Sequence, residues 1–200
     1  MTSHVAKAAI SEEDTMRASL YGLLGSLLFV APSTDTLNSM QDLSGDETEM
    51  GNAFDTLAKL STATDVKTAL DEYNGLFIGM GRGELLPYAS YYLTGFLNEK
   101  PLAKLRNTMQ ELNIARSDET KEPEDHIGSL FQMMAGLITG SYGAPAMIAV
   151  QRDFFDTHIE PWASHFFKDL EAAELSRLYQ PVGTIGRLFV GIETDAFSME

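Results

Sequence analysis

Residues Glu122–Gly140 read EPEDHIGSLFQMMAGLITG, and this stretch decides the fold class. A proline followed by acidic residues is typical of the first turn of a helix, because the ring fixes φ and the acids meet the positive end of the helix dipole. Apolar residues then recur at spacings of three and four, which marks one buried helix face: Ile127, Leu130, Phe131, Met134, Leu137 and Ile138. The stretch therefore predicts a helix, ended by Gly140, that packs into a core.

The same helical period continues on both sides of this stretch. Helices are predicted before it over residues 11–32, 46–60, 64–77 and 101–112, and after it over residues 145–166 and from 169 or 170 to 188. Pro161 is expected to kink the first of the later helices, because proline lacks the N–H of a backbone bond. The second is expected to bend near Pro181 and Gly183.

No alternating stretch is long enough to predict a sheet, and Tyr88–Leu93 is the best candidate for a strand. We therefore predict an all-α protein with a single helical-bundle domain over residues 11–200. Residues 1–10 are expected to form a flexible N-terminus, and residues 79–87 and 113–121 to act as hinges.

Composition and charge exclude several classes of function. The chain has 200 residues and no cysteine, which excludes disulfides, thiolate metal sites and cysteine nucleophiles. Its 14 Lys and Arg against 29 Asp and Glu give a net charge of −15, which repels phosphate backbones and anionic membranes. The arginines are scattered and form no basic stripe. We expect no nucleic-acid partner, and an acidic surface favours basic partners or serves solubility alone.

The apolar stretch Ala18–Ala31 is too short to span a membrane, which takes about 20 apolar residues. Acidic residues precede it, whereas a secretory signal would carry Lys or Arg there. Its leucines follow the helical spacing of a packed face. We therefore expect a cytoplasmic protein that neither inserts into a membrane nor is exported.

The glycine run at Gly79, Gly81 and Gly83 lacks the Lys-Ser/Thr of a phosphate loop and follows no strand, so it predicts a flexible loop. His158 and His165 lie seven residues apart and are expected to share a helix face. A metal site there is one interpretation, and a buried His158 satisfied by one hydrogen bond is the other.

Asp125 and His126 form a doublet at a predicted helix start, which we expect to be exposed and where the carboxylate suits the helix dipole. A role as a helix cap and a functional role both remain open. A nucleophilic triad is excluded, because no serine lies in a sharp turn.

The doublet and several other segments resemble one protein family. The run Glu122-Pro123-Glu124-Asp125-His126 is similar to the Glu-Pro-x-Asp-His signature of the TorD/DmsD-type redox-enzyme maturation chaperones. Further segments agree in order and spacing: Arg17 to Leu24, Tyr73 to Gly79, Leu86 to Tyr92, and Phe154 to Trp162.

This resemblance implies a cytoplasmic, all-helical chaperone without enzymatic activity. Such proteins bind the apo catalytic subunit of a molybdoenzyme of the dimethyl-sulfoxide-reductase type, and many bind its twin-arginine signal peptide until the molybdenum cofactor is inserted, which proofreads export. We expect no metal or other cofactor, because the histidines lack ligand spacing and there is no cysteine; the resemblance alone implies weak GTP binding. The two predicted hinges allow a domain-swapped dimer as well as a monomer. The resemblance assigns contact with the peptide or client to these residues: Arg17, Tyr73, Leu76, Phe77, Pro87, Tyr88, Glu122, Pro123, Glu124, Asp125 and His126.

Two other classes of protein remain as alternatives. One is an all-α metal- or haem-binding enzyme that uses His126, His158 and His165. The other is a plain dimerisation or regulatory module. The peptide-binding hypothesis fits the composition, since a twin-arginine peptide needs acids beside an apolar, aromatic groove, and ten methionines suit an adaptable surface.

Overall fold

A computed structural model describes residues 10–116 and 122–199, and within these ranges the regular structure is helical apart from one isolated β-bridge. The predicted all-α class is confirmed. The helices are α1 (Glu12–Phe29), α2 (Thr34–Gln41), α3 (Glu49–Ala63), α4 (Val66–Tyr73), the π-helical turn η1 (Asn74–Ile78), α5 (Ala89–Thr94), α6 (Lys100–Glu111), α7 (Ile127–Thr139), α8 (Ile148–His158), α9 (Glu160–Ala172) and α10 (Tyr179–Ser198). The predicted flexible N-terminus and most of the second predicted hinge lie outside the described residues.

Helix starts follow the capping chemistry of the sequence. The side chains of Ser11, Ser33, Thr48 and Asp65 each accept a hydrogen bond from a backbone N–H in the first turn of the helix that follows. Each cap satisfies one N–H that has no partner within its helix.

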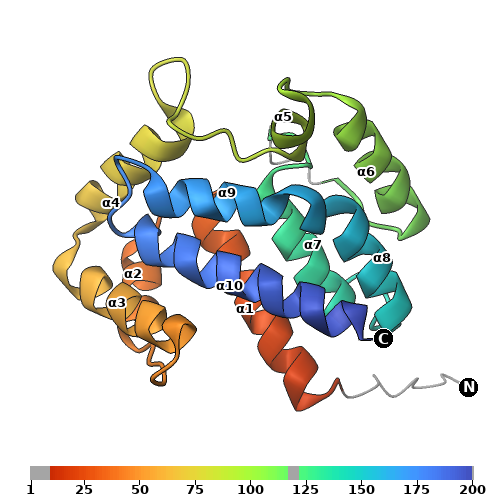
Figure 1. Ribbon diagram of the computed structural model, residues 1–200, viewed down its shortest axis with the longest axis horizontal. Helices are drawn as coiled ribbons and strands as arrows, with labels where there is room; N and C mark the ends of the chain where they lie inside the picture. The colour runs from red at the N-terminus through yellow and green to blue at the C-terminus, as the bar shows by residue number, and fades with distance from the viewer. Residues whose placement is uncertain (1–9, 117–121, 200) are drawn as a thin grey trace, which may run out of the picture.

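Two tight helix pairs organise the bundle, α1 with α7 and α9 with α10 (Figure 1). Glycines allow the close approach in both. A Cβ on Gly128 of α7 would lie 2.8 Å from the carbonyl oxygen of Gly25 in α1. In the second pair, a Cβ on Gly186 of α10 would overlap the ring of Phe167 in α9. Close approach brings the aromatic side chains of all four helices into one core.

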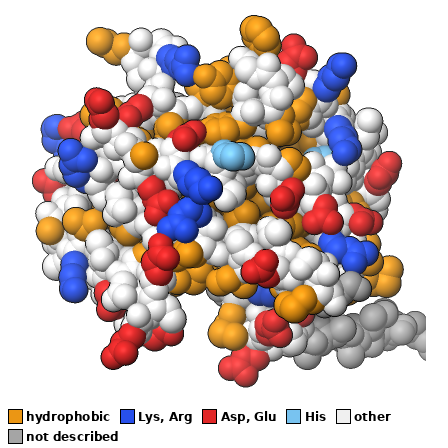
Figure 2. Space-filling view, viewed as in Figure 1, with side chains coloured by type: hydrophobic (Ala, Val, Ile, Leu, Met, Phe, Trp, Pro, Cys, Tyr) orange, Lys and Arg blue, Asp and Glu red, His pale blue; other side chains and the backbone are white. Residues whose placement is uncertain are grey.

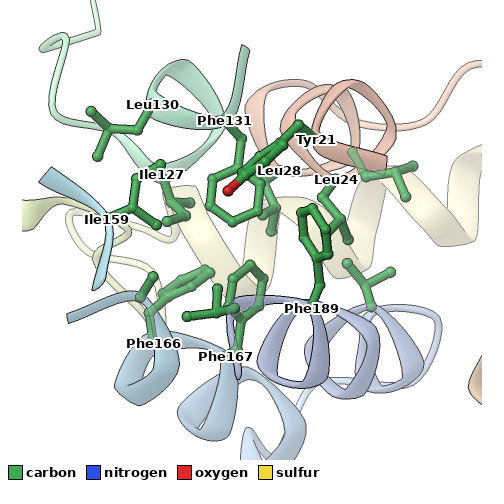
Figure 3. Packing of buried hydrophobic residues seen from close by; sticks show 14 of the residues in the cluster. Tyr21, Leu24, Leu28, Ile127, Leu130, Phe131, Ile159, Phe166, Phe167 and Phe189 are labelled. Atoms are coloured by element: carbon green, nitrogen blue, oxygen red, sulfur yellow. The ribbon is translucent and has the colours of Figure 1, made fainter. Parts of the chain in front are cut away.

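The core is built around Tyr21 (Figure 3). Its ring meets Phe131 of α7 and Phe189 of α10 edge-on, with centroids 5.1 and 4.6 Å apart. Its hydroxyl donates to buried Glu193, which also accepts two 2.8 Å hydrogen bonds from Arg17. A buried carboxylate is thus matched by charge and by hydrogen bonds, as burial requires.

The structure differs from the predicted elements in four places. Helix α2 lies between the first two predicted helices, where the prediction had none. The strand candidate Tyr88–Leu93 is wrong, since α5 covers it. The predicted long helix with a kink at Pro161 is two helices, because the backbone breaks at Ile159 and Pro161 occupies the first turn of α9. The last helix begins only at Tyr179, so Pro181 also lies in a first turn, where its missing N–H breaks no bond within the helix.

The break at Ile159 changes the histidine prediction. His158 is buried at the end of α8, whereas His165 is exposed on α9, so the two do not share a face. Within residues 10–116 and 122–199, no helix combines the length and the apolar character that crossing a bilayer requires.

Two glycines of the same helix test the packing of α9 on α10. Gly186→Ala is expected to destabilise the protein by about 1–3 kcal/mol, because the methyl group would overlap the buried Phe167 ring. Gly191→Ala is the matched control and is expected to stabilise by about 0.5–1 kcal/mol, because a Cβ there meets nothing within 4 Å and alanine is the better helix former. Urea unfolding measures both changes, and equal stabilisation by both would contradict this packing.

Candidate functional site

A pair of backbone hydrogen bonds joins the segment before α5 to the Glu-Pro-x-Asp-His run. The N–H of Ala89 donates to the carbonyl of Asp125 at 3.0 Å, and the N–H of Ile127 donates to the carbonyl of Pro87 at 2.8 Å. Together they form an antiparallel bridge between Tyr88 and His126. Two segments more than 30 residues apart in sequence are thereby held side by side.

Asp125 reinforces this junction from its side chain. One carboxylate oxygen accepts a 2.8 Å hydrogen bond from the backbone N–H of Ser90, in the first turn of α5. Asp125 therefore caps a neighbouring helix rather than its own, and only 1% of it is exposed. The doublet does stand at a helix start, that of α7, but the expectation that it is exposed is wrong.

His126 is the residue that caps α7. Its Nδ1 accepts from the N–H of Gly128 at 3.0 Å, so in the neutral ring the proton lies on Nε2. Phe29 and Tyr88 lie edge-on to the ring, with centroids 5.5 and 5.2 Å away. Because only 3% of His126 is exposed to water, burial lowers its pKa to about 3. The helix begins at Ile127, so Pro123 precedes it and does not occupy its first position.

A cavity of about 300 Å³ opens beside this junction. Six of the predicted site residues line it: Tyr73, Phe77, Pro87, Tyr88, Glu122 and His126. The sequence analysis missed its other wall, made by the end of α1 and the exposed faces of α4 and η1: Phe29, Val30, Ala31, Leu70, Asn74 and Ile78. Of these, Val30, Leu70 and Ile78 are large apolar side chains that remain 42–62% exposed.

The polar groups of the cavity centre on Glu122. Tyr88 donates its hydroxyl hydrogen bond to the Glu122 carboxylate, and burial together with that carboxylate raises the pKa of Tyr88 well above its usual value. Burial, with the nearby charge of Glu122, raises the pKa of Tyr73 to about 12. The hydroxyl of Tyr73 donates to the carbonyl of Phe29 at 2.9 Å, which satisfies the end of α1. The cavity therefore presents one carboxylate against an apolar, aromatic wall.

The remaining predicted site residues lie elsewhere. Leu76 is fully buried in the core. Glu124 is directed to Arg106, with bonds of 2.8 and 3.1 Å, and to Arg116. Burial favours the neutral form of Glu124, but the Arg106 hydrogen bonds and the charges of both arginines outweigh it and lower its pKa. Arg17 lies in the α1–α10 ion pair with Glu193, outside the cavity.

His126, His158 and His165 do not come together as metal ligands would. Nε2 of His158 lies 2.9 Å from the hydroxyl of Thr108, so the interpretation of a buried histidine satisfied by one hydrogen bond is confirmed. Across the described part of the chain, no three His, Asp or Glu side chains converge as metal ligands would.

A family model described as the nitrate reductase delta subunit matches residues 44–168, more than half of the chain. The chain belongs to this family. Among its curated relatives, the chaperone protein TorD of Aliivibrio salmonicida is 30% identical over 119 residues, which cover 55% of each chain. The probable Tat proofreading chaperone DmsD of Haemophilus influenzae is 28% identical over 178 residues, covering 84% of this chain and 85% of the relative.

These names confirm the family resemblance predicted from the Glu-Pro-x-Asp-His run, and they make the family one of chaperones rather than enzymes. The family named by these relatives gives no support to the alternative of a metal or haem enzyme. The chain spans about half the length of the first relatives it matches, with 40% of TorD from Photobacterium profundum covered. A solved structure described as a redox enzyme maturation protein, from Archaeoglobus fulgidus, matches with a TM-score of 0.55 at 23% identity over 90% of this chain and 94% of that chain, and it shares the fold.

The buried His126 makes stability depend on pH. Its folded pKa of about 3 lies below the unfolded value near 6.5, so between these values the unfolded chain binds more protons and acid favours unfolding. The contribution of His126 is complete above about pH 6.5 and should fall by roughly 2 kcal/mol by pH 4.5. His126→Asn keeps a capping acceptor but cannot titrate. Urea unfolding at pH 7 and 4.5 should show a smaller loss for this variant, and equal losses would contradict a buried neutral imidazole.

Proposed function

We propose that this chain is a cytoplasmic chaperone that binds the apo catalytic subunit and the twin-arginine signal peptide of a molybdoenzyme of the dimethyl-sulfoxide-reductase type. In this proposal it holds back export while the molybdenum cofactor is inserted. The observation that carries the proposal is the cavity beside the Tyr88–His126 bridge, which places the Glu122 carboxylate against exposed apolar side chains. A signal peptide offers the complementary pair, fixed positive charges followed by an apolar run.

The apolar wall should supply most of the affinity. An exposed ion pair contributes only about 0–1 kcal/mol, whereas burial of apolar surface contributes about 25 cal/mol per Å². Val30, Leu70 and Ile78 offer such surface around the cavity mouth. The net charge of −15 then raises the rate at which a basic peptide associates and favours basic peptides over others.

The residues of the signature act beneath this surface. His126 and Asp125 are 3% and 1% exposed, and their hydrogen bonds go to the first turns of α7 and α5. They hold the cavity wall in place before the peptide arrives, which lowers the entropic cost of binding. No cofactor enters the proposal. GTP binding stays a prediction of the family resemblance, and a monomer or a domain-swapped dimer stays a prediction from the two hinges.

Titration calorimetry tests the proposal with the signal peptide of the host's molybdoenzyme and a version in which both arginines are lysine. The arginine peptide should bind more tightly, because a planar guanidinium can meet a carboxylate through two hydrogen bonds. Binding should weaken without vanishing between about 0.05 and 0.5 M salt, as screening shortens from roughly 14 to 4 Å. Equal affinity for both peptides with no salt dependence would contradict a charged peptide site.

Two isoleucines of equal exposure test the place of binding. Ile78, which lines the cavity, is 54% exposed, and Ile192 on α10 is 55% exposed. Ile78→Ser should weaken the peptide's affinity about three- to tenfold, since burial of a partly exposed isoleucine contributes on the order of 1 kcal/mol. Ile192→Ser should leave the affinity unchanged. The same loss in both variants would place the peptide elsewhere.

A further inference from the structure

A second cavity lies on the other side of the Asp125 segment and shares no lining residue with the first. Its volume is about 330 Å³, and α5, α6 and α8 surround it. These helices lie together at one end of the bundle in Figure 1. The walls are mostly apolar, with Ala89 and Leu93 from α5 and Pro101 and Leu105 from α6.

Two lysines, Lys100 and Lys104, also line this cavity, one helical turn apart on α6. Neither forms an ion pair within residues 10–116 and 122–199. Like charges four residues apart repel each other on a helix, and cations are unfavourable near a helix N-terminus. Lys100 and Lys104 therefore destabilise α6 rather than stabilise it. Their position is unusual in a chain whose net charge is −15.

The floor of the cavity contains Asp125, which is 1% exposed. Its Oδ2 accepts from Ser90, while its Oδ1 accepts no hydrogen bond from the described residues. Asp125 lines the cavity, so an N–H group of a peptide backbone or side-chain amide that reaches the floor can donate to its carboxylate. His158 at the back wall is already bonded to Thr108.

Apolar surface continues outside the cavity mouth. Leu93 is 44% exposed, and Phe96 and Leu97 in the link from α5 to α6 are 70% and 42% exposed. Figure 2 shows hydrophobic side chains over this end of the molecule, with charged side chains of both signs among them. A ligand with an apolar body and negative charge would complement the apolar walls and the two lysines.

We propose that this second cavity docks an acidic, apolar peptide segment of the client's mature chain. One leucine or phenylalanine side chain enters the cavity, flanking carboxylates meet Lys100 and Lys104, and a peptide N–H donates to Asp125. A cavity of this size suits a single anchoring side chain. The two lysines disfavour a twin-arginine segment there. That the client supplies this segment rests on the proposed function. That the cavity binds an acidic, apolar peptide does not depend on it.

Fluorescence anisotropy tests the site with two labelled hexapeptides, Glu-Glu-Leu-Phe-Glu-Glu and Lys-Lys-Leu-Phe-Lys-Lys, at about 0.05 M salt. The acidic peptide should bind and the basic one should bind at least tenfold more weakly. The double variant Lys100→Gln/Lys104→Gln should weaken the acidic peptide about tenfold, while Lys59→Gln/Lys168→Gln, at exposed lysines elsewhere, should not change it. An unchanged affinity in the first variant would overturn the proposal, as would preference for vesicles of phosphatidylglycerol over the acidic peptide.

A pair of matched leucines separates the two cavities. Leu93, 44% exposed, lines only the second, and Leu70, 42% exposed, lines only the first. Leu93→Ser should weaken the acidic peptide severalfold and leave a twin-arginine peptide unchanged, and Leu70→Ser should do the reverse. Competition between the two peptides for one site would overturn the second site. Binding of the acidic peptide without any binding of the twin-arginine peptide would instead leave this site standing and contradict the proposed function.

Discussion

The antiparallel bridge between Tyr88 and His126 is the interaction on which both cavities depend. Two backbone hydrogen bonds and the Asp125 carboxylate fix the segment before α5 against the start of α7. One side of this junction carries Tyr88, His126 and the first cavity. The other side carries Ala89, Asp125 and the second cavity. Without the junction, α5 is a six-residue helix that is too short to be stable alone.

This arrangement separates support from contact. The family signature is easy to recognise in the sequence, yet its Asp125 and His126 are buried. Both side chains accept hydrogen bonds from backbone N–H groups at the starts of helices. Exposed apolar side chains around them, such as Ile78 and Leu93, carry no signature of their own. Residues that contact a ligand must be held in a fixed geometry. The buried hydrogen bonds of Asp125 and His126 serve this purpose, because they keep the helix ends beneath the contact surface rigid.

The helical class and most helices could be predicted because their apolar residues recur at the helical period, as in α7. The break at Ile159 could not be predicted. Pro161 is compatible both with a kink inside a helix and with the first turn of a new helix, and only packing decides between them. Helix α2 has eight residues with only Leu37 and Met40 buried, a pattern too short to recognise. The strand candidate at Tyr88–Leu93 failed because its aromatic residues favour strands locally while Asp125, distant in sequence, caps a helix there.

For the candidate site, the resemblance brought six residues of the first cavity together, but it also included Arg17, Leu76 and Glu124. Arg17 and Glu124 form ion pairs with residues distant in the sequence, and a sequence pattern does not reveal such pairs. The wall from the end of α1 was missed because Phe29, Val30 and Ala31 meet α4 only in the folded chain. A sequence signal existed in the apolar run that continues to Ala31, beyond the last helical residue, Phe29.

In the proposed function, this chain escorts a molybdoenzyme subunit before export. The most direct measurement is affinity purification of the tagged chain from its native cell, followed by identification of the protein that co-purifies and measurement of its molybdenum. We expect a large catalytic subunit that retains its twin-arginine leader and lacks molybdenum. A molybdenum-loaded enzyme without its leader, or no redox enzyme subunit at all, would contradict the proposed function.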